Sequence, residues 1–220
     1  MKRTLKIILG ILTAVSLSAC GNTASDTASA DMSETAALSE ETPQISEAET
    51  KTASEETETD GSGTAVVYFS ATGNTADIAK KLADALGADI YEIVPAEPYS
   101  AEDLDYNNDS CRANAEMNDD SARPAIENDL SDAVKHDTIF IGYPIWWGTS
   151  PKMINTFMET YDLSGKTVYT FCTSGGSGIE QSVGSLQSAY PDVDIIGGKR
   201  FGSGSSEADL NAWLDEIGMK

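Results

Sequence analysis

The residues that build metal centres and disulfide frameworks are scarce in this sequence, which contains one histidine and three cysteines among 220 residues. A structural zinc site needs about four Cys or His ligands close together, and the sequence has no such cluster, so we expect no structural metal. Three cysteines are too few for a disulfide framework. Cys111 and Cys172 could pair in an oxidising compartment, but a buried free Cys172 is the simpler expectation because it lies in an apolar run.

Positive charge is scarce as well, with 14 Lys and Arg residues against 36 Asp and Glu residues and a formal net charge of −22. The imbalance persists from Gly61 to the end of the chain, where 25 acidic residues face 10 basic ones. Such a surface repels a phosphate backbone, so we expect no nucleic-acid partner.

The sequence also lacks an apolar run of the roughly 20 residues that span a bilayer. Its only related feature is a short N-terminal signal, which consists of Lys2, Arg3 and Lys6, the mostly apolar residues 7–15, and the tetrapeptide LSAC ending in Cys20. This pattern resembles a bacterial lipobox, which implies cleavage before Cys20 and diacylglycerol attachment to it. Residues 1–19 are thus expected to be a lipoprotein signal peptide. The alternative is an uncleaved anchor with an incidental cysteine.

Residues 20–62 follow this signal and consist, after Cys20, almost entirely of Ser, Thr, Ala, Glu and Asp without an aromatic residue. Such a segment cannot bury enough apolar surface to offset its ordering entropy, so we expect a disordered acidic tether. A flexible chain of this length reaches roughly 35 Å. The protein is therefore expected to be exported and anchored by lipid at the extracytoplasmic face of the cell membrane, with its globular domain over residues 63–220.

Apolar runs typical of strands alternate with helical patterns from residue 64 onward. Strands are predicted over Thr64–Ser70, Asp89–Pro95, His136–Pro144, Lys166–Thr173 and Val193–Phe201, and helices over Asn74–Gly87, Ser150–Tyr161, Gly178–Tyr190 and Ser206–Gly218. Strands this continuously apolar fit a parallel sheet covered on both faces, so we predict a doubly wound α/β domain. Ligands of such sheets bind beyond the carboxyl ends of the strands.

The loop Ser70–Thr75, SATGNT, follows the first predicted strand and opens a helix. Gly73 allows close approach of the backbone to an anion, and the first helical amides and the Ser, Thr and Asn side chains supply donors. The loop has no Lys for a triphosphate and no spaced glycines for a dinucleotide, so a monophosphate fits best. The alternative is a Ser/Thr-rich helix cap.

Two further loops follow strands at the same edge of the predicted sheet. The loop GYPIWWGTSP, residues 142–151, contains adjacent tryptophans that are hard to bury together, so Trp146 or Trp147 is expected to stack on a planar ligand. The alternative is that both belong to the core. The loop CTSGGSG, residues 172–178, permits main-chain contacts to the edge of a flat heterocycle, or is a plain flexible turn.

Together the three loops resemble the FMN-binding flavodoxin-like superfamily, most closely its flavodoxin family proteins of the lipoprotein type. The resemblance implies an α/β sheet of order 2-1-3-4-5 in three layers. It also implies a phosphate site of Ser70, Ala71, Thr72, Gly73, Asn74 and Thr75, a ring site of Pro144, Ile145, Trp146, Trp147 and Gly148, and pyrimidine contacts from Thr173, Ser174, Gly175 and Gly176. Many flavodoxins also bring a tyrosine from the third loop to the ring, and this sequence has none there.

The segment Ala96–Asn128 shows no regular pattern, and a long loop in a compact domain is usually functional or disordered. Tyr99 and Tyr106 could cover the open face of a flavin. Arg112 and Arg123 are expected to be solvated at the surface, although either could meet an anionic acceptor. His136, at a strand start, is expected to be structural.

Three functions remain open on these observations. The first is a membrane-tethered electron-transfer flavoprotein that uses its acidic surface to meet redox partner proteins. The second is an FMN-dependent reductase of quinone-like or other small electron acceptors. The third is a lipid-anchored binding module without a redox-active flavin. In the first two the cofactor carries the chemistry, so no catalytic side chain is expected.

Overall fold

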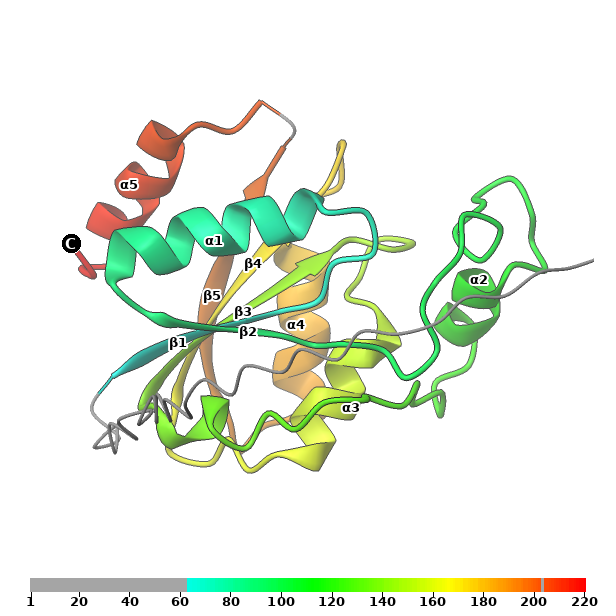
Figure 1. Cartoon of the computed structure of the whole chain (residues 1–220), viewed down its shortest axis with the longest axis horizontal. Helices are drawn as coiled ribbons and strands as arrows, with labels where there is room; N and C mark the ends of the chain where they lie inside the picture. Colours follow the sequence, from blue (N-terminus) through cyan, green and yellow to red (C-terminus); the bar gives the residue numbers. More distant parts are fainter. Residues whose placement is uncertain (1–62, 203) are drawn as a thin grey trace, which may run out of the picture. The chain divides into compact units, whose positions relative to one another are not determined.

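The computed structural model describes residues 63–202 and 204–220 (Figure 1). The expected signal peptide, the lipidated Cys20 and the acidic tether lie outside the described residues. The elements in chain order are β1 (Thr64–Tyr68), α1 (Asn74–Leu86), β2 (Asp89–Glu92), α2 (Arg112–Met117), the 3-10 turn η1 (Ala133–Lys135), β3 (Thr138–Pro144), α3 (Lys152–Thr160), β4 (Thr167–Thr173), α4 (Glu180–Ala189), β5 (Asp194–Phe201) and α5 (Glu207–Glu216).

The five strands form one sheet of order β2-β1-β3-β4-β5, and every neighbouring pair is parallel. The strand order reverses at β1, which lies between β2 and β3. The loops after β1 and β3 therefore start at a topological switch point, where open α/β sheets bind ligands. The predicted fold class and strand order are confirmed.

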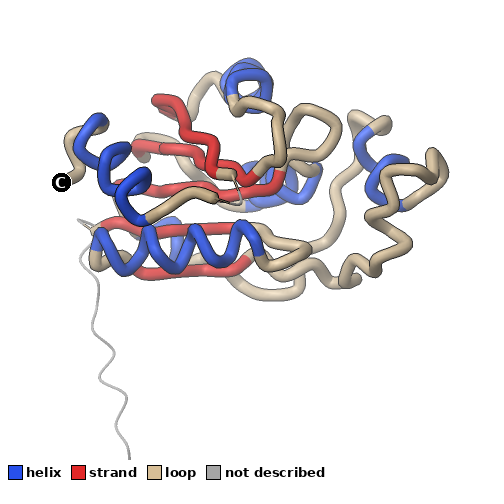
Figure 2. Tube along the Cα trace, turned by 90° about the horizontal axis from the view of Figure 1, so that it is seen from above, coloured by secondary structure: helices blue, strands red, loops and turns tan. Residues whose placement is uncertain are grey.

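Helices cover both faces of the sheet, which gives three layers (Figure 2). The side chains of α1 and α5 form one apolar cluster with Val66 and Phe140, whereas those of α3 and α4 form another with Val67 and Ile141. Consecutive residues of a strand point to opposite faces, so Val66 and Val67 serve different clusters. This explains why the strands read as continuous apolar runs rather than alternating ones.

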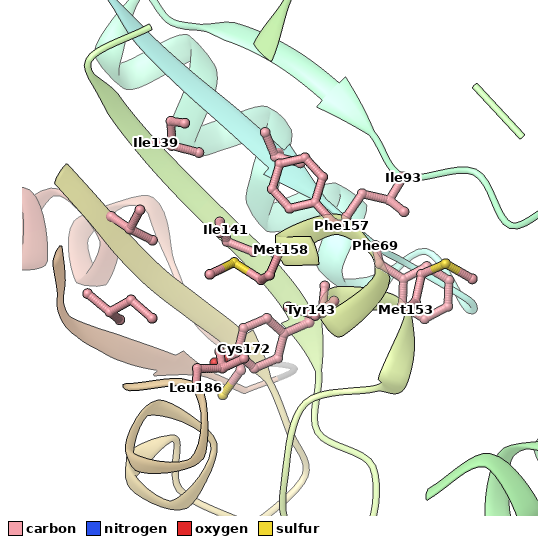
Figure 3. Packing of buried hydrophobic residues seen from close by; sticks show 14 of the residues in the cluster. Phe69, Ile93, Ile139, Ile141, Tyr143, Met153, Phe157, Met158, Cys172 and Leu186 are labelled. Atoms are coloured by element: carbon pink, nitrogen blue, oxygen red, sulfur yellow. The ribbon is translucent and has the colours of Figure 1, made fainter. Parts of the chain in front are cut away.

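The cluster on the α3 and α4 face extends toward the carboxyl ends of the strands. Figure 3 shows Phe69 and Tyr143 from the sheet side of this cluster, with Met153 and Phe157 contributed by α3 and Leu186 by α4. Phe69 and Tyr143 are buried although they lie beside the edge of the sheet where a ligand is predicted to bind. The loops at this edge of the sheet therefore lie next to closely packed core side chains.

The prediction of an irregular segment over residues 96–128 is partly wrong, because the segment contains α2 and a bridge between Pro95 and Ile126. The Cys111 side chain caps α2 by accepting the Asn114 N–H. In Figure 1 this segment lies at the end of the domain toward which the β3 arrow points. It therefore stands beside the predicted ligand loops.

Both cysteines of the described ranges are buried and free, so Cys111 and Cys172 are not paired. The expectation for Cys172 is confirmed, whereas Cys111 is buried despite its polar sequence surroundings. No helix in residues 63–202 and 204–220 is long and apolar enough to cross a membrane.

Candidate functional site

A cavity of about 480 Å³ lies at the carboxyl ends of the strands. All three predicted loops contribute to its wall, through Ala71, Thr72, Asn74, Pro144, Ile145, Trp146, Thr173, Ser174 and Gly175. The structure therefore brings together loops that are separated by about a hundred residues along the chain. Six other predicted residues do not line the cavity, namely Ser70, Gly73, Thr75, Trp147, Gly148 and Gly176.

The first loop presents unpaired backbone donors. Gly73 precedes α1 with a φ of 87°, in the left-handed region, and its N–H donates to the Ser70 hydroxyl oxygen at 3.1 Å. The first helical N–H groups, those of Asn74, Thr75 and Ala76, have no partner within the described residues. Unpaired amides at a helix N-terminus attract anions because the helix dipole adds to their partial charge. The donor set fits a phosphate group.

The predicted donor Thr75 is occupied within the protein. Its side chain is buried, and its hydroxyl lies 2.8 Å from the Thr173 hydroxyl. This bond joins the start of α1 to the end of β4. It therefore fixes the loop Ser70–Thr75 against the loop that follows β4. The side-chain amide of Asn74 donates to the Thr72 hydroxyl at 3.0 Å, which orders the exposed rim of the loop.

The second loop makes a tight two-residue turn. Trp146 and Thr149 exchange backbone hydrogen bonds of 2.9 and 3.0 Å. The two residues between them have positive φ, 45° at Trp147 and 87° at Gly148. A tryptophan in this region stores strain of roughly 1–3 kcal/mol, which is found most often at functional sites. A Cβ at Gly148 would also press on the Gln181 side chain.

The turn separates the two tryptophans. Trp146 is 3% exposed and packs edge-on against Phe69 and Tyr99, with ring centroids 5.5 and 5.1 Å apart, while part of it lines the cavity. Trp147 is 40% exposed and stands 4.8 Å from the ring of Tyr106, which lines the cavity and is 58% exposed. The inference that the pair cannot be buried together is correct, and stacking on a ligand stays a prediction.

The third loop is fixed by the end of β5. The Ser174 N–H donates to the Phe201 carbonyl at 3.1 Å, and the Arg200 guanidinium donates to the Ser174 carbonyl at 2.8 Å. The Gly176 N–H donates to the Ser174 hydroxyl at 3.1 Å. Within the described residues the Gly175 N–H has no partner, so this amide is left for a ligand.

Within the segment 96–128 a half-buried arginine ties α2 to Tyr99, whose ring packs against Phe69 and Trp146. The Arg112 guanidinium carbon lies 4.2 Å from the centre of the Tyr99 ring, and its Nε is 2.8 Å from the Glu116 carboxylate. The Tyr99 hydroxyl donates to the same carboxylate. Burial, together with this carboxylate, raises the pKa of Tyr99 well above its ordinary value. Arg112 thus links α2 to the aromatic cluster under the cavity.

The expectation of two surface-solvated arginines is wrong for Arg112 and incomplete for Arg123. The Arg123 guanidinium forms a two-pronged pair with Glu159 of α3, with distances of 2.8 and 2.7 Å. Its hydrogen bonds hold the pKa of Glu159 below the ordinary value. Neither arginine lines the cavity. His136 is buried beside Asp89, at the opposite end of β3 from the cavity, as a structural residue would be.

Sequence reasoning missed part of the cavity wall, formed by Asp77, Ile78, Lys81, Leu104, Phe201, Gly202 and Ser205. The loop after β5 could have been found, because it also follows a parallel strand. Asp77, Ile78 and Lys81 lie on one helical face with Asn74, at spacings of three and four residues, which a helical projection would have revealed.

Nucleophile or metal chemistry has no support in the described part of the chain. No group of three or more His, Cys, Asp or Glu side chains is placed to hold a metal ion there. Burial raises the pKa of the Cys172 thiol to about 12, the Arg200 charge opposes this rise and the Glu180 charge adds to it. A thiol so protonated is a poor nucleophile. Cys172 therefore serves as a packing residue of the core.

Comparisons with known proteins agree with this geometry. Residues 64–217 match the flavodoxin family. A solved protein of Bacteroides eggerthii DSM 20697 assigned to the flavoproteins is 48% identical, with a TM-score of 0.69 over 72% of this chain and 99% of that one. A similar protein of Bacteroides uniformis ATCC 8492 is 43% identical, with a TM-score of 0.68 over 70% and 99%. The flavoprotein of Lactobacillus acidophilus NCFM, solved in complex with FMN, is 24% identical, with a TM-score of 0.55 over 69% and 98%, which supports a shared fold. No curated protein matches the chain.

Proposed function

The chain belongs to the flavodoxin family, and we propose that it is an FMN-binding electron-transfer protein held at the extracytoplasmic face of the cell membrane by a lipid on Cys20. The observation that carries the cofactor assignment is the set of unpaired amides at the start of α1, where Asn74 lines the same cavity as residues of the loops after β3 and β4. A monophosphate with an attached flat ring is the ligand this arrangement fits.

FMN, the ligand of the Lactobacillus protein, meets this requirement. The Asn74 N–H and the Thr72 hydroxyl, on two residues that line the cavity, would hold its phosphate, with the unpaired Thr75 N–H next to them. The Gly175 N–H would meet the ring edge. When bound, FMN supplies the redox chemistry, and reduction adds negative charge to its ring. The protein binds and orients the cofactor and shields it from water.

The aromatic wall of the site comes from two segments. Trp146 is too deeply buried to offer a full face, whereas the exposed Tyr106 and Trp147 rings lie together at the cavity rim. We assign to Tyr106 the part that a third-loop tyrosine has in many flavodoxins. The segment 96–128 would then complete the ring site.

Electron transfer to protein partners is favoured by charge around this rim. Glu102, Asp105 and Asp109 are exposed on the segment that carries Tyr106. Within the described residues none of the three forms an ion pair. Such a surface steers a basic partner toward the cavity and has little attraction for an acidic one.

A reductase of quinone-like or other small acceptors is the second candidate. It is favoured by the part of the cavity wall beyond the three loops, where Ile78, Lys81 and Ser205 could border a small molecule beside the flavin. A binding module without redox-active flavin is the third, and absence of flavin binding would select it.

One experiment separates the three functions. The purified chain is titrated with FMN and followed by absorption, and the complex is then reduced by light under anaerobic conditions. Reduction in two separate one-electron stages, with slow reoxidation by a small quinone, supports electron transfer. A single two-electron stage with rapid reoxidation by the quinone supports the reductase. If micromolar FMN causes no spectral change, the chain does not bind flavin, and the binding module is the function that remains.

The membrane attachment has its own test. Expression of the chain and of its Cys20→Ser variant in bacteria fed a labelled fatty acid should give label and membrane association for the first only. Equal distribution of both proteins between membrane and soluble fractions would contradict the proposed lipid anchor.

A further inference from the structure

Arg200 differs from most cations of the described part in having no carboxylate partner. Six basic side chains form ion pairs there, those of Arg112, Arg123, Lys135, Lys152, Lys166 and Lys199. The Arg200 guanidinium instead donates to the carbonyl of Ser174 at 2.8 Å. A carbonyl satisfies a donor without cancelling its charge. Within the described residues Arg200 therefore carries a positive charge that no ion pair neutralises.

This charge lies next to the third loop. Arg200 is paired in register with Cys172, two residues before the cavity-lining Ser174, and is followed by Phe201, which lines the same cavity. Arg200 itself lines a neighbouring hollow that shares Phe201, Gly202 and Ser205 with the cavity. The Ser174 N–H donates to the Phe201 carbonyl, so the end of β5 holds both main-chain groups of Ser174. The loop is fixed in the conformation that leaves the Gly175 N–H unpaired.

We propose that Arg200 sets the reduction potential of the bound flavin, because it fixes the third loop and places a positive charge beside the ring edge that gains negative charge on reduction. The inference rests on the proposed FMN site and deepens it. Opposite charges attract, so Arg200 stabilises the reduced cofactor more than the oxidised one, by a modest amount because solvent partly screens its exposed side chain. The many acidic residues of the protein disfavour added negative charge on the cofactor, and Arg200 opposes this effect.

Glu180 provides a counterpart of opposite sign. It begins α4, and a Cβ at Gly178 of the third loop would overlap its carboxylate. Its negative charge therefore acts on the same loop and opposes that of Arg200. Removal of either charge should shift the potential, in opposite directions.

The test measures the midpoint potential of the FMN complex and the dissociation constant of oxidised FMN for Arg200→Gln and Glu180→Gln. Lys199→Gln is the matched control, since it removes the same charge from the neighbouring residue, whose Nζ lies 3.7 Å from the Glu216 carboxylate. We expect Arg200→Gln to weaken the binding of reduced FMN about fivefold relative to the binding of oxidised FMN. This change lowers a two-electron potential by about 20 mV. High salt should shrink this shift, because the side chain is exposed to solvent.

The outcomes are distinct. Glu180→Gln should raise the potential, and Lys199→Gln should change it less than Arg200→Gln does. Arg200→Lys, which keeps the positive charge, should leave the potential close to that of the unaltered chain. If Arg200→Gln weakens oxidised and reduced FMN equally, the potential stays constant and the residue only braces the loop, which overturns the inference but not the proposed function. If the unaltered chain binds no FMN, both are overturned.

Discussion

Replacement of Arg112 by methionine should weaken both the fold and the cofactor site. The change keeps an apolar stem but removes the cation over Tyr99 and the pair with Glu116, whose side chain is 15% exposed. Loss of the cation over the ring costs about 0.5–2 kcal/mol. Loss of a hydrogen bond to a charged group costs about 1.5–3 kcal/mol. Glu116 still accepts the hydrogen bond of the Tyr99 hydroxyl in the variant, which limits the cost of its lost partner. We therefore expect the unfolding free energy to fall by about 2–3 kcal/mol in total.

The effect on FMN follows from what the segment carries. Leu104 and Tyr106 line the cavity, and both belong to the segment in which Arg112 ties α2 to Tyr99. If the segment loosens, the flavin loses one aromatic wall, which is worth roughly 1–2 kcal/mol, or about 5- to 30-fold in dissociation constant. Fluorescence titration with FMN measures this loss, and urea unfolding measures the stability.

Arg123→Met is the matched control. It removes an arginine from the same segment, but its pair with Glu159 is more exposed and does not touch the cavity. An exposed pair contributes about 0.2–1 kcal/mol, so stability should fall slightly and FMN affinity should stay constant. Equal losses of FMN affinity in the two variants, or unchanged affinity in Arg112→Met despite lower stability, would refute the role assigned to Arg112.

Three further substitutions test other parts of the account. Gly142→Ala should lower the unfolding free energy by about 1–3 kcal/mol, because the added Cβ would overlap the Phe171 ring; unchanged urea unfolding would contradict this packing. Trp147→Ala should weaken FMN binding by roughly 1–3 kcal/mol in a fluorescence titration, and an unaltered affinity would remove Trp147 from the ring site. Burial raises the pKa of Cys172 to about 12, so the unfolded thiol loses its proton near pH 9.0 while the folded one keeps it. Stability should therefore be full below pH 9.0 and fall as the pH rises toward 12, and Cys172→Ala should make this decline shallower; equal slopes in alkaline urea unfolding would argue against the assignment.

The layers of the fold were predictable because strong local signals mark them. The run from Thr64 to Tyr68 is apolar throughout, and Gly73 and Gly87 bound α1 as the sequence indicates, both with positive φ. Parallel strands bring their carboxyl ends to one edge, which is why three distant loops could be assigned to one site. Boundaries differed by a few residues, as at β2, an edge strand that ends at Glu92 rather than at Pro95.

The features that the sequence did not predict depend on contacts between residues that are distant along the chain. α2 has only six residues and no apolar stripe, so nothing in its sequence distinguishes it from a loop. The placement of Tyr106 beside Trp147 depends on how the whole segment 96–128 folds back. Trp146 is buried and Trp147 is exposed because the turn between them places Trp147 at positive φ. Tryptophan rarely adopts this conformation, so the sequence does not predict it.

The central claim is that the loop after β1 holds the phosphate of FMN. Parallel titrations of the purified chain with FMN and with riboflavin, which has the same ring and no phosphate, test it most directly. Several charge-assisted hydrogen bonds from backbone amides should make FMN bind at least about tenfold more tightly, with one molecule per chain. Equal affinity for the two compounds, or no binding of FMN at micromolar concentration, would contradict the account.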